Sequence, residues 1–341
     1  MVKNSILLVS CYRDCVIVLI FMFFSTTIGS AEEKTPEFFT FTFENDIFVG
    51  DDNGYTNGTG ITFGKGPFKE FNESNLPPWL IWLTKDLYIN TMKNKRHGVA
   101  HMFFQRMQTP NDLTKTELIA NDVPYAGLLA WQGTLYAWDN DITDQLSFYL
   151  GTVGPNALAE QTQNFIHNIT GSDKANGWDN QIRNEIVFKI EAHRIWNLYR
   201  TQGDGLQFDL LGLAGAGIGN LESATKAGFA IRWGSHLQTS FQSFSLQADR
   251  QVNPLSVSAN NDFYIFFGGR AGIILNDILI DGNTFKDSHS VPLEHFQNQV
   301  SSGVVWSIGH SAFVFQVTSL SSRTTLTNTR ENYGAFSITY H

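Results

Sequence analysis

Apolar and polar residues alternate along most of the chain. Phe39, Phe41 and Phe43 alternate with Thr40 and Thr42, and the same period of two returns as far as the C-terminal residues. A period of two with one strongly apolar face is the signature of a β-strand. The pattern predicts strands at roughly 38–46, 57–66, 98–108, 126–139, 144–152, 182–197, 205–217, 226–234, 238–249, 262–280, 297–308, 311–321 and 331–340.

These segments predict a transmembrane barrel. Many are near the roughly ten residues that a tilted strand needs to cross a bilayer. An antiparallel barrel with both chain ends on the periplasmic side needs an even number of strands, so two of the segments are expected to form one long strand. The predicted fold is an all-β, twelve-stranded antiparallel barrel, closed so that no strand edge is left unpaired in lipid. Aromatic girdles are expected from Trp79, Trp82, Trp131, Trp138, Trp196, Trp233 and Trp306.

One short amphipathic helix interrupts the strand pattern within residues 151–181. Gly154-Pro155 predicts its start and Gly171 its end. At 3.6 residues per turn its side chains divide into an apolar face and a polar face. The apolar face holds Leu158, Thr162, Phe165 and Ile169, and the polar face holds Glu160, Gln163 and His167. Leu158, Phe165 and Ile169 are expected to dock the helix, unless it is only a connector with a surface histidine.

Two further stretches do not follow the strand pattern. Residues 72–95 contain Pro77-Pro78 and then a helix-like apolar spacing, which predicts an extracellular loop helix or a hairpin cap. Residues 279–298 are a polar loop with a turn signal at Asp281-Gly282. Short helices are therefore expected in the loops, and no stretch suggests a linker or a second domain.

The first 31 residues have the features of a secretory signal peptide. Lys3 and Arg13 precede a short apolar run at 15–24, and small residues at 29–31 provide a cleavage site. The run is too short to span a bilayer as a helix. Residues 1–31 are therefore expected to be removed, and residues 32–341 to form a single outer-membrane domain.

The composition narrows the class of protein. Asp and Glu total 32 against 23 Lys and Arg, and the net charge of −9 argues against a nucleic-acid partner, which needs basic surface. Only 16% of residues are charged and 28 are Phe, which suits a lipid-facing β-structure. Both cysteines, Cys11 and Cys15, lie in the predicted signal peptide. The mature protein would therefore hold no disulfide and no thiol catalyst.

Oxygen-bearing side chains cluster where the first predicted strand ends. Asn45 and Asp46 directly continue a hydrophobic strand, and Asp51-Asp52-Asn53-Gly54 follows them. Local turn chemistry explains the second group well, because Asp and Asn cap backbone groups in turns, but it explains Asn45 and Asp46 poorly. Carboxylate and amide oxygens are also ligands that Ca²⁺ prefers, although the spacing does not fit an EF-hand. A calcium ion here would be either catalytic or structural.

Two further groups are candidates for chemistry. Gln105–Lys115 is a strand end, a proline turn and a lysine, and a loop lysine is usually only a solvated charge. His167 lies on the predicted helix. A histidine near a metal-held carbonyl can act as a general base on water when a carboxylate orients its other ring nitrogen.

Three sequence blocks together resemble the outer-membrane lipid A 3′-O-deacylase family. They are ENDIFVGDDNGYTNG at 44–58, QTP at 108–110, and the run from Gly151 to Gln181, which contains GPNALAEQTQNFIHN and GWDNQ. The blocks keep their order and spacing over the mature chain. The resemblance implies a twelve-stranded barrel with a calcium-dependent esterase site at the barrel wall near the outer leaflet. Lipid A of lipopolysaccharide would be the substrate, and the protein would be a monomer.

The resemblance also implies roles for single residues. The family's Asn-Asp pair, which holds calcium, matches Asn45 and Asp46, and Asp173 stands where the family has a glutamate. Other site positions match Tyr55, Thr56, Lys115, Gln163 and His167. The implied mechanism resembles that of secreted phospholipase A2. Calcium would polarise the ester carbonyl, Lys115 could help, and His167 would take a proton from the attacking water. Asp173 or Glu160 would orient the imidazole.

Two other functions fit the same barrel. An outer-membrane phospholipase would share calcium and ester hydrolysis but would use a serine nucleophile, and no serine stands beside His167 in a comparable setting. A porin or adhesin would have no site, and His167 would have no role. Hydrolysis that survives serine-reactive inhibitors would exclude the first alternative, and any hydrolysis would exclude the second.

Overall fold

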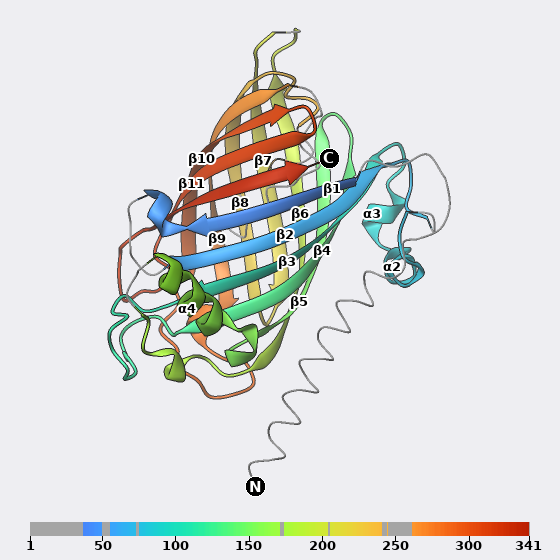
Figure 1. Ribbon diagram of the computed structural model, residues 1–341. Helices are drawn as coiled ribbons and strands as arrows, with labels where there is room; N and C mark the ends of the chain where they lie inside the picture. Colours follow the sequence, from blue (N-terminus) through green and yellow to red (C-terminus); the bar gives the residue numbers. More distant parts are fainter. Residues whose placement is uncertain are drawn as a thin grey trace. The chain divides into compact units, whose positions relative to one another are not determined.

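Twelve antiparallel strands close into a barrel in which each strand pairs with its sequence neighbours and β1 pairs with β12 (Figure 1). The computed structural model describes residues 37–49, 55–72, 75–170, 174–203, 205–240, 244 and 261–340. The predicted twelve-stranded barrel is therefore confirmed, whereas the predicted signal peptide lies outside the described residues. The strands are β1 Glu37–Asn45, β2 Tyr55–Phe68, β3 Arg96–Gln108, β4 Ala126–Trp138, β5 Ile142–Val153, β6 Glu185–Arg200, β7 Gln207–Gly219, β8 Glu222–Gly234, β9 Phe263–Asp277, β10 Phe296–Ile308, β11 Ser311–Leu320 and β12 Glu331–Tyr340.

The alternation of side chains is that of a barrel immersed in lipid. Phe39 and Phe41 are exposed on the outer wall, while Thr40 and Thr42 between them are buried in the lumen. The Thr40 hydroxyl is 2.8 Å from the hydroxyl of Thr339 on β12, so lumen-facing polar groups satisfy one another. An apolar exterior around a polar interior is the pattern of an outer-membrane barrel. No helix among the described residues is long and apolar enough to cross a membrane.

One predicted strand is wrong. Residues 238–249 were expected to form a strand, but 238–240 belong to a turn after β8, and most of the remaining residues lie outside the described part of the chain. Residues 235–262 connect β8 to β9. The other twelve predicted segments each correspond to one strand, so no two of them merge.

The tryptophans only partly follow the predicted girdles. Trp233 and Trp306 are exposed near the ends of β8 and β10, as a girdle requires. Trp131 instead lies in the middle of β4, opposite Phe103. Trp138 is at a strand end but is buried, so the prediction is wrong for Trp131 and Trp138.

The connections divide between two rims of the barrel. The terminal rim is where β1 begins and β12 ends, and it carries the connections 69–95, 139–141, 201–206, 235–262 and 309–310. The α4 rim is the opposite one, and it carries 46–54, 109–125, 154–184, 220–221, 278–295 and 321–330. The predicted helix within 72–95 is present as two short helices, α2 Pro78–Thr84 and α3 Tyr88–Thr91. They belong to the terminal rim, which is the periplasmic one if both chain ends are periplasmic.

The mouth at the α4 rim is filled by side chains and loops. The segment predicted as a polar loop begins with α5 Ile278–Asp281, whose three isoleucine and leucine side chains are buried. Gln108 donates to the carbonyl of Leu279 at 2.8 Å and accepts from the guanidinium of Arg323 at 2.5 Å. These bonds tie β3, the β9–β10 connection and the β11–β12 connection together across the mouth.

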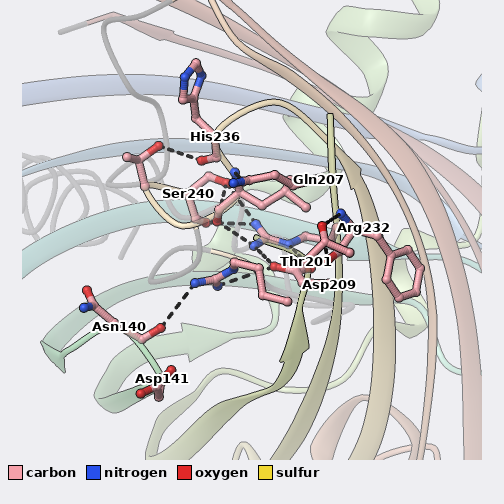
Figure 2. A network of polar contacts seen from close by, with 12 residues as sticks. Asn140, Asp141, Thr201, Gln207, Asp209, Arg232, His236 and Ser240 are labelled. Carbon is pink, nitrogen blue, oxygen red and sulfur yellow. Dashed lines mark hydrogen bonds and ion pairs between the residues drawn. The ribbon is translucent and has the colours of Figure 1, made fainter. Parts of the chain in front are cut away.

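The mouth at the terminal rim is held by a buried ion pair, which Figure 2 shows from close by. Arg232 and Asp209 are fully buried, and the guanidinium donates to both carboxylate oxygens at 2.6 and 3.0 Å. The same guanidinium donates to the carbonyl of Leu237 and to the hydroxyl of Ser240. Leu237 is thereby held in a buried apolar cluster with Phe244. Buried polar contacts therefore join neighbouring elements at both ends of the described lumen.

Candidate active site

The helix α4, Ala159–Thr170, lies on the outer wall of the barrel at the α4 rim (Figure 1). A Cβ built on Gly127 of β4 would be 2.6 Å from the Cβ of Ala159, so the glycine lets helix and wall approach closely. Gln105 of β3 donates to the carbonyl of Ala157 at 2.6 Å, just before the helix begins. Met107, also on the outer face of β3, is buried in the cluster that contains Ala159. The helix is therefore seated on β3 and β4.

The predicted helix is present, but its buried face is not the predicted one. Leu158 and Phe165 were expected to dock the helix, yet they are 52% and 65% exposed. Ala159 and Gln163 are buried instead. The physical reason is the surrounding medium, because on the outer wall of a membrane barrel the apolar face belongs to lipid and the polar face to protein. The side chain of Ile169 lies outside the described part of the structure.

The start of the helix also differs from the prediction. Gly154-Pro155 begins a short 3-10 turn, η2 Pro155–Ala157, and Leu158 then adopts a left-handed conformation with φ of 58°. α4 begins only at Ala159. The helix does end at Thr170, directly before the predicted cap at Gly171.

Gln163 is fixed by an aromatic pair below the helix. Its side-chain oxygen accepts a hydrogen bond from the indole N–H of Trp178 at 2.7 Å, and Gln163 is 1% exposed. The ring of Trp178 packs against Tyr125, with centroids 5.0 Å apart. Burial raises the pKa of the Tyr125 hydroxyl. The other polar side-chain atom of Gln163, Nε2, is buried and has no hydrogen-bond partner among the described residues, so it can donate to a further group.

The loop that carries Lys115 is joined to the segment after the helix. Asn176 donates its N–H to the carbonyl of Leu113 at 2.9 Å, and Asn180 donates its side-chain amide to the carbonyl of Thr116 at 2.8 Å. The loop that follows the second sequence block is therefore adjacent in space to the third block. The Lys115 side chain itself is 54% exposed, and its Nζ lies 3.6 Å from Asp112.

Asp112 is held in its charged form by its own turn. The hydroxyl and the N–H of Thr114 donate to its carboxylate at 2.7 and 3.1 Å. These hydrogen bonds, with a smaller contribution from Lys115, lower the pKa of Asp112. The carboxylate is thus available as a partner for Lys115 at any pH near neutral.

Asn45 and Asp46 lie where β1 ends at the α4 rim. Each is only 6% exposed, and Asp46 begins the 3-10 helix η1 Asp46–Val49. Phe48 of η1 packs against Phe43 and Phe315 on the outer wall, with centroids 5.9 and 6.1 Å away. The end of β1 is therefore folded onto the outer wall. A buried carboxylate beside a buried amide provides oxygen donors of the type that a hard cation binds.

Several predicted site residues cannot be placed. Asp173 and Asp51 to Gly54 lie outside the described residues, as do the side chains of Tyr55 and Thr56, whose backbone belongs to β2. Within the described part of the chain, no group of three or more His, Cys, Asp and Glu side chains has the arrangement of a metal site. The predicted roles of Thr56 and Asp173 remain predictions.

The register places the predicted blocks at one level of the wall. Glu44 pairs with Gly58, Gly58 with Arg106, and Arg106 with Leu128, so the end of β1 is level with the parts of β3 and β4 near α4. The turn η2 contacts β4 and β5, whereas α4 contacts β4 and β3, so the helix runs toward β2. His167 follows Ala159 by about 12 Å of helix, and β1 is about 14 Å from β4. The helix therefore extends His167 toward the end of β1.

Comparison with known proteins identifies the family. A family model described as "Outer membrane protein LpxR" matches residues 16–341. The chain belongs to the LpxR family. The predicted family is thereby confirmed, and the family together with the closed barrel makes this an outer-membrane protein. No curated protein sequence matches the chain.

One solved structure has the same barrel fold. LpxR from Salmonella typhimurium is similar with a TM-score of 0.75 at 16% identity, over 89% of this chain and 99% of that chain. The β domain of the Bordetella autotransporter Brka is similar with a TM-score of 0.42 at 9% identity, over 90% of this chain and 98% of that one. The translocator domain of NalP from Neisseria meningitidis gives 0.41 at 9% identity, over 99% and 98%.

Three residues that hold this site were given no role by the sequence. Gln105 anchors the start of the helix, Gly127 lets the helix approach the wall, and Trp178 holds Gln163. Trp178 lies within the third sequence block that the family resemblance marks, whereas Gln105 lies just before the second. Gly127 lies in an apolar strand and carries no sequence signal.

Proposed function

We propose that this protein is a calcium-dependent esterase that removes the 3′-O-linked acyl chain from lipid A of lipopolysaccharide. The observation that carries the proposal is the seat of α4 on the outer wall, with its polar face toward the protein and its apolar face outward. A site on the outer wall meets an ester of a membrane lipid without drawing the lipid out of the bilayer. Membership of the LpxR family supports the same reaction.

The orientation of the barrel supports this substrate. β1 begins and β12 ends at the terminal rim, and in outer-membrane barrels with an even strand number both ends are periplasmic. The α4 rim then faces the outside of the cell. The site lies at the level of the outer leaflet, where lipid A is found.

His167 is the proposed general base. It accepts a proton from the water that attacks the ester carbonyl, and then returns that proton to the sugar oxygen as the C–O bond of the tetrahedral intermediate breaks, so that no acyl-enzyme forms. Gln163 lies one turn earlier on the same helical face, and its bond to Trp178 fixes the rotation of the helix about its axis. That rotation turns His167 toward the wall and the ester rather than toward lipid. General-base catalysis of this kind contributes about 10²–10⁴-fold.

Asn45 and Asp46 are the residues proposed to hold calcium. Both are buried at the end of β1, and their oxygens suit a hard cation. When bound there, calcium polarises the ester carbonyl and stabilises the negative charge that develops on its oxygen. Thr56 is proposed to line the same site, because β2 is the strand that lies between β1 and the β3–β4 seat of the helix.

Lys115 is proposed to help neutralise the developing charge. In the structure its ammonium group is paired with Asp112 on an exposed loop. Exposed ion pairs contribute little, because water solvates both charges. Lys115 can therefore exchange Asp112 for the anionic lipid, while the bonds of Asn176 and Asn180 keep its loop beside the helix.

Of the two carboxylates considered for orienting His167, the helix favours Asp173. Glu160 is seven residues before His167, which corresponds to about 10 Å along the axis. Side chains on a helix meet at spacings of three and four, so Glu160 is out of reach. Asp173 follows the end of α4 by three residues and is the proposed orienting group.

The packed lumen favours this function over a porin. Lys189 and Glu191 form an ion pair of 3.0 Å inside the barrel, and the Tyr149 hydroxyl donates to the same carboxylate. Gln108 and Arg323 are bonded to each other near one rim, and Arg232 binds the carbonyl of Leu237 near the other. Solute passage would have to break these buried contacts, whereas a wall site leaves them intact.

The direct test uses the purified barrel and lipid A in mixed micelles. We expect release of 3′-linked acyl chains that stops with a calcium chelator and returns with added Ca²⁺. A serine-reactive phosphonate should leave the rate unchanged, because the mechanism has no serine nucleophile. Release that persists in excess chelator would contradict the calcium role, and inhibition by the phosphonate would favour the phospholipase mechanism.

A further inference from the structure

A second surface of the molecule lies on the outer wall at the terminal rim, formed by α2 and α3. Leu80 of α2 and Ile89 of α3 are buried in a cluster with Val99, Leu135 and Leu146. Leu135 of β4 pairs with Val99 of β3 and with Leu146 of β5. All three lie on the face that points away from the lumen. The two helices therefore cover part of the wall that would otherwise face lipid (Figure 1).

The uncovered side of α2 is strongly apolar. Trp79, Trp82 and Leu83 are 43%, 72% and 49% exposed, while Leu80 and Thr84 on the opposite side are buried. The spacing of i, i+3 and i+4 puts the three exposed side chains on one helical face. Tyr88 of α3, 42% exposed, adds a fourth large ring to this surface.

Charged groups nearby mark the depth of this surface in the membrane. On the outer face of β5 and β6, Asp144 accepts from Arg194 at 2.6 Å and from Lys95 at 3.2 Å. Charged side chains on the lipid face are costly in the hydrocarbon core but not at the interface, so this cluster marks the headgroup level. Burial is the main cause that raises the pKa of Tyr88, and the nearby Asp144 carboxylate adds to it. Because α3 contacts β5, which carries Asp144, Tyr88 lies near this cluster.

The charge of the connection that carries α2 and α3 also suits the headgroup level. Residues 69–96 contain five Lys and Arg against three Asp and Glu, in a chain whose net charge is −9. Lys85 and Lys93 are exposed beside the apolar face. Trp and Tyr with basic neighbours are enriched where hydrocarbon meets headgroups, because their rings are apolar at one end and polar at the other. Basic side chains there attract anionic headgroups.

We propose that α2 and α3 form a lipid anchor that inserts into the glycerophospholipid leaflet at the terminal rim. Trp79, Trp82 and Leu83 enter the boundary between acyl chains and headgroups, and Lys85 and Lys93 contact anionic headgroups. The surface continues the lipid-facing wall, whose uncovered residues include the exposed Phe188 and Ile190 of β6. Lipid is therefore the occupant that is already adjacent to it. The anchor would fix the depth of the barrel, and with it the height of the α4 rim in the other leaflet.

The test measures what surrounds single positions of the full chain. Both cysteines lie at the N-terminus, so a Cys11→Ser, Cys15→Ser background gives a chain without thiols. A nitroxide is attached to a cysteine at Trp82→Cys, with Leu83→Cys as a second site on the same face. The controls are Asp86→Cys, an exposed polar position in the turn after α2, and Phe188→Cys on the bare wall.

Each labelled barrel is reconstituted alone in a nanodisc of phosphatidylethanolamine and phosphatidylglycerol, and collisions with oxygen and with a water-soluble nickel chelate are compared. The ratio of oxygen to nickel collisions at positions 82 and 83 should exceed that at position 86 at least threefold and approach that at position 188. Nickel collisions at 82 and 83 as frequent as at 86 would mean that the helices lie in water. Protection from both reagents would mean that protein covers the surface. Either result overturns the proposal.

Discussion

The seat of α4 gives the sharpest prediction. In Gly127→Ala the new Cβ would lie 2.6 Å from the Cβ of Ala159 and 3.1 Å from that of Ala157. Carbon atoms pack at about 3.5–4.0 Å, so the helix must move outward by roughly 1 Å. β4 itself is paired along its length to β3 and β5, and we expect the barrel to fold normally.

A shift of this size should be visible in the rate. Displacement of a catalytic group by about 1 Å costs on the order of 10²-fold even when the mutated residue is far from the chemistry. The assay is the release of 3′-linked acyl chains from lipid A by the purified variant, after heat-modifiable migration has shown that the barrel is folded. The expected loss is in the chemical step, because Gly127 touches the helix backbone and not the ester.

Two matched variants control this reasoning. Gly269→Ala adds the same methyl group to the outer face of β9, where the nearest atoms are 3.2 and 3.8 Å away, and it should keep wild-type activity. Ala159→Gly combined with Gly127→Ala removes the nearest clash and should restore part of the rate, at a helix cost of at most about 1 kcal/mol. Wild-type activity of Gly127→Ala as a folded barrel would refute the idea that the seat of α4 positions the site.

Three further predictions concern the site residues. His167→Asn should lower the rate by about 10²–10⁴-fold with little change in thermal stability, since the variant has no imidazole to accept the proton from water. Asp46→Asn should raise the calcium concentration needed for half-maximal activity, as followed by calcium titration of the acyl-release rate. Lys115→Met should lower kcat more than it changes KM, because the charge that it neutralises develops only in the transition state.

Each of these variants must first be shown to migrate as a folded barrel. Near wild-type release by His167→Asn would assign the base to another residue. A folded Asp46→Asn with an unchanged calcium titration would remove it from the ion's ligands, and a variant that fails to fold would make its role structural. Lys115→Met with a raised KM alone would make Lys115 a binding residue.

The sequence predicted the barrel because the lipid and lumen faces alternate on each strand. Phe39 and Phe41 against Thr40 and Thr42 are enough to show this period, and an even count closes the sheet. The same rule fails for the predicted strand at 238–249, of which residues 238–240 form a turn. Leu237 and Phe244 are apolar because they pack into a buried cluster from a loop. Periodicity alone does not distinguish a strand from a loop that carries apolar residues into a core.

The site could be predicted in part. The presence of the helix and the residues of its polar face follow from the sequence, but the burial of Gln163 on that face does not. Which face is buried does not follow, because Leu158 and Phe165 indicate docking only if the surroundings are water. Gln105 and Gly127 could not be found either, since their roles depend on the register between β3, β4 and the helix.

The measurement that tests the central claim most directly is mass spectrometry of lipid A from cells that produce this chain, compared with cells that produce an equal amount of folded His167→Asn. With the wild-type chain, lipid A should lose the mass of the 3′-O-linked acyl substituent, and the remaining acyl chains should stay in place. With His167→Asn the lipid A should keep its full mass. Identical lipid A from the two strains, or loss of a chain from another position, would contradict the account.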